Sequence, residues 1–120
     1  MGVNLNSLPK MLSNPKHSIE GLWASDAGRN SNSGKYSGTF IGWFDKIEIN
    51  IGETTQAELT QIRNAIESPI IEDVTFTDTR TGNNKTEDFY GTTITAERLN
   101  SNRYKPFSFT LTAIERRTDM

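Results

Sequence analysis

The chain has no cysteine and only one histidine among its 120 residues. Without thiols, a disulfide framework, a thiolate zinc site and a cysteine nucleophile are excluded, and the composition fits a protein that folds in a reducing cytoplasm. The single histidine, His17, lies in a polar segment that contains proline. Catalytic and metal sites usually need a second positioned group beside a histidine. We therefore interpret His17 as a solvated side chain.

Long apolar runs are also missing. No segment approaches the roughly 20 apolar residues of a transmembrane helix, and the first residues lack the apolar stretch of a signal peptide. We therefore expect a soluble protein that is neither secreted nor inserted in a membrane. The 13 basic and 15 acidic residues nearly balance, with a net charge of −2. Composition thus gives no electrostatic argument for a nucleic-acid partner.

Motifs for catalysis or cofactor binding are not recognisable in the sequence. Glycines in the loop segment fit neither a phosphate loop nor a dinucleotide fingerprint, and no nucleophile elbow accompanies the serines. The carboxylates match no calcium loop, and strands place alternate residues on opposite faces. We interpret these carboxylates as surface charge: Asp45, Glu48, Asp73, Asp78, Glu87 and Asp88. We expect no enzymatic activity, no catalytic residue, no metal and no cofactor.

The length of the chain suits a single domain with one hydrophobic core. Residues 1–18 contain two prolines and three asparagines, and we expect them to form an amino-terminal arm. A single domain should occupy residues 19–117, followed by a short tail at 118–120. Within the domain, residues 25–38 are rich in serine, glycine and asparagine, and strand-like segments flank them. This pattern predicts a long hairpin that protrudes from the domain.

Local patterns predict the order of the remaining elements. Residues 47–51 alternate between isoleucine and polar side chains, which indicates a half-buried strand. Thr55 and Glu58 have the spacing of a capping box, which predicts a helix over about residues 55–67. Three further strands are expected at residues 70–79, 88–99 and 107–113.

This order of strands, one helix and more strands favours a mainly β fold with one α-helix. We expect an antiparallel β-sandwich or a partly closed barrel that the helix flanks. The members of the periodic faces should build the core. They are Ile47, Ile49, Ile51, Leu59, Ile62, Ile66, Val74, Phe76, Ile94, Phe107, Phe109 and Leu111.

A candidate interface follows from bulky side chains on both expected faces of one strand. In an extended strand, Phe40 and Phe44 lie on one side, and Ile41 and Trp43 lie on the other. Core packing of one face with partial exposure of the other accounts for this pattern, and so does a subunit interface. Arginine and tyrosine are enriched in interfaces. The candidate subunit interface therefore consists of Arg29, Tyr36, Phe40 and Trp43.

Several short motifs follow one another in a set order between residues 25 and 117. An Arg-Asn pair and a glycine lie in the loop, and a lysine opens a strand before a Leu-x-x-Ile helix. An aromatic-Tyr strand and a final strand that closes on Ile-Glu-Arg come after it. The residues at these places are Arg29, Asn30, Gly34, Lys46, Leu59, Ile62, Phe89, Tyr90 and Glu115. The order resembles small tail proteins of phages that infect Gram-positive bacteria, although Gly91 directly follows Tyr90 where related sequences often separate the two.

The resemblance implies the tail-tube-like fold, with two packed antiparallel sheets, one flanking helix, and rings commonly of six subunits. It implies a structural subunit of a bacteriophage tail, in the tip, baseplate or tube, that is made in the host cytoplasm and resides in the virion. Its partners would be copies of itself in a hexameric ring and neighbouring tail proteins, and the genome would pass through the channel without sequence-specific binding. The alternative is a monomeric binding module, such as a head–tail connector or a small regulator. That module would contact nucleic acid through Arg29, Lys35, Arg103 and Lys105.

Overall fold

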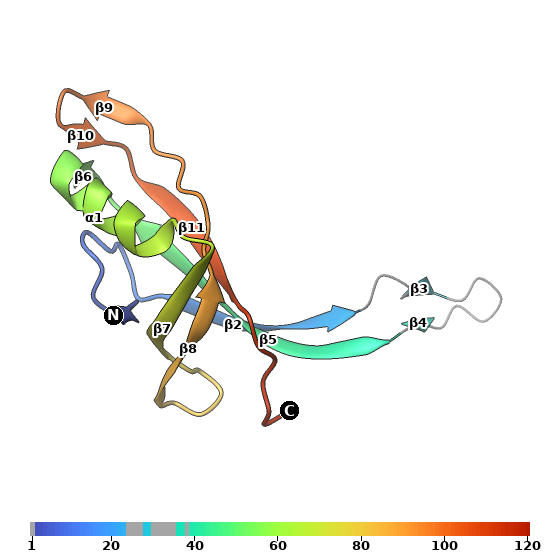
Figure 1. The fold of residues 1–120 in the computed structure, drawn as a ribbon. Coiled ribbons are helices and arrows are strands. Elements are labelled where there is room, and N and C mark those ends of the chain that lie inside the picture. Colours follow the sequence, from blue (N-terminus) through green and yellow to red (C-terminus); the bar gives the residue numbers. More distant parts are fainter. Residues whose placement is uncertain (1, 24–27, 30–35, 38) are drawn as a thin grey trace.

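A computed structural model gives the fold of the chain and describes residues 2–23, 28–29, 36–37 and 39–120 (Figure 1). The strands of this part are β1 (Val3–Asn4), β2 (Lys16–Trp23), β3 (Gly28–Arg29), β4 (Tyr36–Ser37), β5 (Phe40–Ile51), β6 (Thr54–Thr55), β7 (Ile70–Thr77), β8 (Asn84–Tyr90), β9 (Arg98–Asn100), β10 (Arg103–Tyr104) and β11 (Phe107–Ala113). One helix, α1 (Gln56–Ile66), lies among them within the described ranges. It is not of the length and apolarity that a membrane crossing requires, and no other helix is described.

Six strands form the main sheet in the order β1-β7-β8-β11-β5-β2. Neighbours in this sheet are antiparallel except for β1 and β7, which are parallel. A small sheet of β6, β10 and β9 and a two-stranded pair of β3 and β4 complete the described strands. The sheets do not close into a barrel. The prediction of a mainly β, sandwich-like fold with one helix is confirmed.

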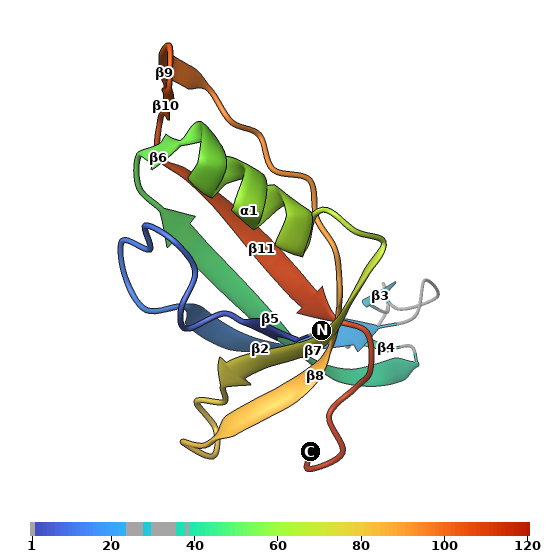
Figure 2. The ribbon, with the colours of Figure 1, turned by 60° about the vertical axis from the view of Figure 1, so that its left-hand side comes forward.

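The core lies between α1 and one face of the main sheet (Figure 2). Alternation on β5 and β11 turns every second side chain toward the helix, and the remaining side chains face outward. Helical spacing places Leu59, Ile62 and Ile66 on the buried face of α1. The predicted core residues are all buried except Phe107, which is half-buried at the first position of β11.

The predicted capping box at the start of α1 is confirmed. The Thr55 hydroxyl accepts a hydrogen bond from the Glu58 amide, and the Glu58 carboxylate accepts one from the Thr55 amide. Each bond satisfies an amide that has no partner within the helix. The Thr55 amide also lowers the pKa of the Glu58 carboxyl, because it hydrogen-bonds the ionised form.

The amino-terminal segment differs from the predicted arm. Leu5 is fully buried in the core, and its amide donates to the carbonyl of Thr75 in β7 at 2.9 Å. A bridge between Met11 and Ile51 fixes the following turn, and β2 already begins at Lys16. A few apolar residues in a polar segment are enough to dock it, because Val3, Leu8 and Met11 pack against the core beside Leu5. Residues 2–18 therefore belong to the domain.

The strand predicted over residues 88–99 also ends earlier, at Tyr90. Side chains at the end of the helix bind the backbone that follows: the Arg63 guanidinium donates to the Ile94 carbonyl, and the carboxylate of Glu67, the residue after α1, accepts from the Ile94 amide. At the turn itself, a Cβ on Gly91 would lie 1.5 Å from the carbonyl oxygen of Ser68. Backbone therefore approaches backbone here as only glycine permits, which explains why Gly91 directly follows Tyr90.

A two-stranded hairpin projects from the main sheet at the end opposite β9 and β10 (Figure 1). Pairing of β11 with β5 reaches Lys46, whereas β2 stays paired with β5 out to Phe40. Beyond Asp45 the hairpin of β2 and β5 therefore leaves the six-stranded sheet, and β3 pairs with β4 further along the same direction. We call residues 20–23 and 40–44 with β3 and β4 the projecting hairpin. The rest of the predicted 25–38 loop lies outside the described residues.

Candidate functional site

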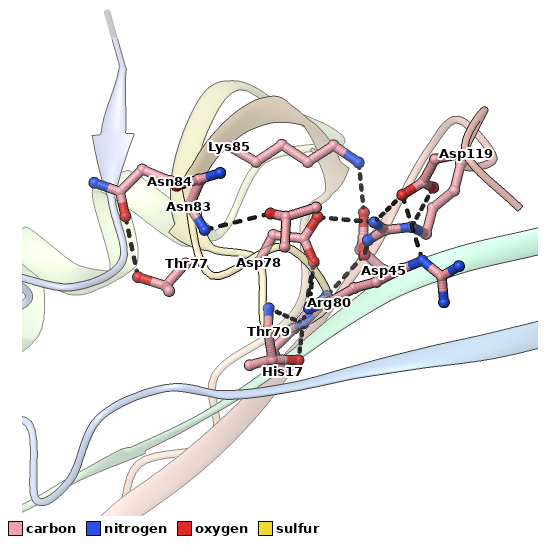
Figure 3. Close-up of polar contacts among 12 residues, drawn as sticks. His17, Asp45, Thr77, Asp78, Thr79, Arg80, Asn83, Asn84, Lys85 and Asp119 are labelled. Atoms are coloured by element: carbon pink, nitrogen blue, oxygen red, sulfur yellow. Dashed lines mark hydrogen bonds and ion pairs between the residues drawn. The ribbon is translucent and has the colours of Figure 1, made fainter.

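Charged side chains, several of them buried, meet where the projecting hairpin leaves the sheet (Figure 3). We call this group the ion network. It joins side chains from β2, β5, the β7–β8 turn, β8 and the segment after β11: His17, Asp45, Asp78, Lys85, Glu87, Arg117 and Asp119. Residues up to 102 positions apart in the sequence are thus joined by side-chain contacts at one point.

The His17 side chain is 1% exposed and lies between two partners. Its Nε2 lies 2.7 Å from a carboxylate oxygen of Asp45, and its Nδ1 lies 3.1 Å from the backbone amide of Thr79. An amide can only donate, so Nδ1 accepts and the proton resides on Nε2, where it is donated to Asp45. His17 is therefore a structural link between the hairpin base and the β7–β8 turn. The prediction that it is a solvated side chain is wrong.

Arg117 is the centre of the ion network and is 5% exposed. Its guanidinium donates to Asp45, to Asp78 at 2.8 Å and to Asp119 at 2.9 Å. Its backbone amide donates to the Trp43 carbonyl at 2.7 Å. Arg117 therefore fastens the segment after β11 both to the domain and to the β5 strand at the base of the hairpin.

The pKa values of the buried carboxyls follow from these partners. Burial opposes ionisation of Asp45, but hydrogen bonds from His17, Lys85 and Arg117 outweigh it, and the net pKa is lowered. Burial also opposes ionisation of Asp78, and the contact with Arg117 again lowers the pKa. Both carboxylates are therefore charged inside the protein, contrary to our interpretation of them as surface charge.

Glu87 behaves in the opposite way. Burial raises the pKa of its carboxyl to about 7, and the nearby charge of Asp45 adds to this, while Lys85 acts against it. One carboxylate oxygen binds Lys85 at 2.9 Å, and the other has no hydrogen-bond partner among the described residues. The Glu87 carboxyl thus has a pKa raised to about 7.

Three members of the ion network have the donor types of a metal site. One ligand atom each from His17, Asp45 and Asp78 lies within 4.8 Å of the others. The Arg117 guanidinium, however, binds both carboxylates, and Lys85 adds a second positive charge beside Asp45. A divalent cation would have to displace Arg117, so these residues fit an ion network better than a metal centre.

The second feature of this region is a group of exposed rings on the hairpin, which we call the aromatic cluster: Trp23, Phe40 and Trp43. The ring of Phe40 lies 5.0 Å from that of Trp23 and 5.2 Å from that of Trp43, centroid to centroid. Exposed fractions are 41%, 37% and 37% in sequence order. The rings cover the backbone of Gly21, where a Cβ would meet the Phe40 ring at 2.9 Å.

The prediction that Phe40 and Trp43 lie on opposite faces of this strand is wrong, because β5 contains a bulge. Gly42 has φ +156°, and the register with β2 shifts here, so that Trp23 pairs with Phe40 and Leu22 pairs with Gly42. The extra residue brings Phe40 and Trp43 to the same face, although simple alternation predicts opposite faces. Leu22 and Ile41, 48% and 39% exposed, add further apolar surface to the hairpin.

Of the predicted interface residues, the structure brings Phe40 and Trp43 together, and Arg29 pairs with Tyr36 through the backbone of β3 and β4. The basic residues of the alternative binding module are not brought together. Arg103 lies in β10, at the opposite end of the molecule from Arg29 in β3 (Figure 1). Lys105 is paired with Glu97, and Lys35 lies outside the described residues.

The ion network was missed from the sequence, although one signal for it was present. Asp45 continues the alternation of Ile47, Ile49 and Ile51, which places its carboxylate on the buried face and demands a cationic partner. Comparisons of the chain with protein-family models, with curated proteins and with solved structures found no match.

Proposed function

We propose that the chain is a structural subunit of a bacteriophage tail that assembles through its projecting hairpin. The observation that carries the proposal is the aromatic cluster. Two tryptophans and a phenylalanine, each more than a third exposed, lie on a two-stranded hairpin outside the core. Large apolar side chains grouped in this way are typical of protein interfaces.

A second copy of the chain is the partner that we propose for this surface. The main sheet ends in β2, an edge strand of eight residues, so a neighbouring strand can extend the sheet there. A hairpin that reaches from one subunit to a different surface of the next makes a head-to-tail contact, and such contacts form a ring when the rotation between subunits closes. A mainly β fold with one helix is compatible with this proposal, but a fold alone does not assign a function.

In this proposal the work of the protein is mechanical. Copies form a ring, which we propose to be hexameric, in the tip, baseplate or tube of the tail, and neighbouring tail proteins contact it in the virion. The genome passes through the channel without sequence-specific contacts. The small net charge of −2 supports such a lining, because a strongly basic surface would hold the phosphate backbone.

Light scattering and negative-stain imaging of the purified protein over a wide range of concentration test this proposal. We expect particles that grow from the 13.5 kDa subunit to rings as concentration rises. The double variant Phe40→Ser/Trp43→Ser should stay monomeric with an unchanged circular dichroism spectrum. Leu99→Ser is the matched control, because Leu99 is 44% exposed on β9 at the far end, and it should assemble normally. A wild-type protein that stays monomeric, or a double variant that assembles like it, would overturn the proposal.

A further inference from the structure

The projecting hairpin receives little stabilisation from the main sheet and its core. From Phe44 outward it is a ribbon of β2 and β5, because β11 has ended. A ribbon of two strands is at best marginally stable in water when nothing packs on it. An interface carried on such a ribbon would lose conformational freedom when it binds a partner, and that loss weakens binding.

The segment that follows β11 compensates for the missing strand. The Arg117 amide donates to the Trp43 carbonyl at 2.7 Å, and the Arg116 guanidinium donates to the Ile41 carbonyl at 3.0 Å. Both bonds reach the side of β5 that β11 no longer covers. The Arg116 side chain also packs on Gly42, where a Cβ would lie 2.9 Å from it.

The other end of this segment is fixed to the domain. The Ile114 amide donates to the Asp88 carbonyl in β8 at 3.1 Å, and the Arg117 side chain is buried in the ion network. Asp45, one of the three carboxylate partners of Arg117, belongs to the same strand as Phe40 and Trp43 and is the last residue before the hairpin leaves the sheet. The ion network and the hairpin are thus joined through one side chain.

We propose that residues 114–119 form a clamp that holds the projecting hairpin in a fixed direction, with Arg117 as the positioning residue that locks it. The clamp pre-organises the aromatic cluster for the neighbouring subunit, and this last step rests on the proposed function. Loss of the clamp frees the hairpin from the domain while the core stays folded. Assembly then weakens although every residue of the interface is still present.

The chain contains a reporter for this motion. Its two tryptophans, Trp23 and Trp43, both lie on the projecting hairpin, so tryptophan fluorescence reports on the hairpin alone. Core amides such as those of residues 47–51 report on the domain in hydrogen exchange. Loss of a clamp changes the tryptophan fluorescence and leaves the exchange of core amides unchanged, whereas a general loss of stability changes both.

Arg117→Lys is the variant of choice, because lysine keeps the charge in the ion network but cannot bind three carboxylates with a planar fork. Arg116→Ala is the second variant and leaves the buried charges intact. Arg98→Lys, the same substitution in an exposed residue at the far end, is the matched control. We expect faster exchange of the amides of residues 40–44, by about tenfold, and more acrylamide quenching in both clamp variants. The control and the core amides should be unchanged.

The clamp is refuted if both clamp variants show wild-type quenching and wild-type exchange in the hairpin, or if core amides accelerate equally in Arg116→Ala. Light scattering of the same samples separates the two proposals. A loosened hairpin in a chain whose wild type never assembles supports the clamp and refutes the proposed function. A wild type that assembles, with variants whose hairpin is unaltered, supports the proposed function and refutes the clamp.

Discussion

Replacing Phe109 with alanine tests the packing of β11 against the helix. Phe109 is 5% exposed, pairs with Ile49 of β5 and stacks on Phe107 at 6.4 Å between ring centroids. Emptying an aromatic core site costs about 3 to 5 kcal/mol, as transfer of the ring and the residual cavity add together. For a chain of this length, each kcal/mol lowers the melting temperature by about 4 °C. We therefore expect a fall of about 12 to 20 °C.

Urea unfolding followed by circular dichroism measures the free energy directly. Ser108→Ala is the control, because Ser108 is the exposed neighbour of Phe109 on the same strand, and its unfolding free energy should change by no more than about 0.5 kcal/mol. A loss below about 1 kcal/mol for Phe109→Ala would show that the core does not rest on this face of β11.

Three further predictions concern single sites. Thr55→Ala should lower the free energy of unfolding in urea by about 1 kcal/mol, because the helix cap is lost. Thr54→Val should be neutral or stabilising, because the buried Thr54 hydroxyl has no partner among the described residues. A larger loss for Thr54→Val than for Thr55→Ala would show that the cap is misplaced. Gly91→Ala should cost at least about 3 kcal/mol, since its Cβ collides with the Ser68 backbone, and a melting temperature equal to that of wild type would refute the close approach. The pKa of Glu87 is raised to about 7 from an ordinary 4.5, so the folded protein binds this proton more tightly than the unfolded chain does. The resulting stabilisation is fully present below pH 4.5, and the free energy of unfolding of the wild type should fall as pH rises from there through about 7. An equal dependence of the unfolding free energy on pH in Glu87→Gln would exclude this carboxyl as the cause.

The elements that the sequence predicts correctly are those that depend on residues close together in the chain. Strict alternation over residues 107–113 specifies both a strand and its buried face, and the pair of Thr55 and Glu58 specifies a helix start within four residues. Such signals need no knowledge of distant partners. The mainly β fold with one helix therefore follows from pattern alone.

The errors share one physical reason, which is dependence on partners far away in sequence. Leu5 is buried only because β7, about 70 residues later, offers it a parallel neighbour. Residues 91–97 leave the sheet where Arg63 and Glu67 bind the backbone of Ile94. His17 and Asp45 are buried because Arg117 and Thr79 reach them across the fold. The candidate interface could be predicted only in part. Bulky side chains in the sequence indicated it, but no sequence pattern predicted the bulge at Gly42 that brings Phe40 and Trp43 together.

Photo-crosslinking from one position on the hairpin tests most directly whether copies of the chain meet there. The chain has no cysteine, so Ile41→Cys, on an exposed hairpin residue, introduces a unique thiol for a benzophenone maleimide, and Leu99→Cys is the matched probe at the far end. We predict that illumination links the Ile41→Cys protein into covalent dimers and a ladder that ends at the size of the ring, and that the Leu99→Cys protein stays monomeric. Absence of cross-linked copies from the hairpin position, or equal ladders from both positions, would contradict assembly through the projecting hairpin.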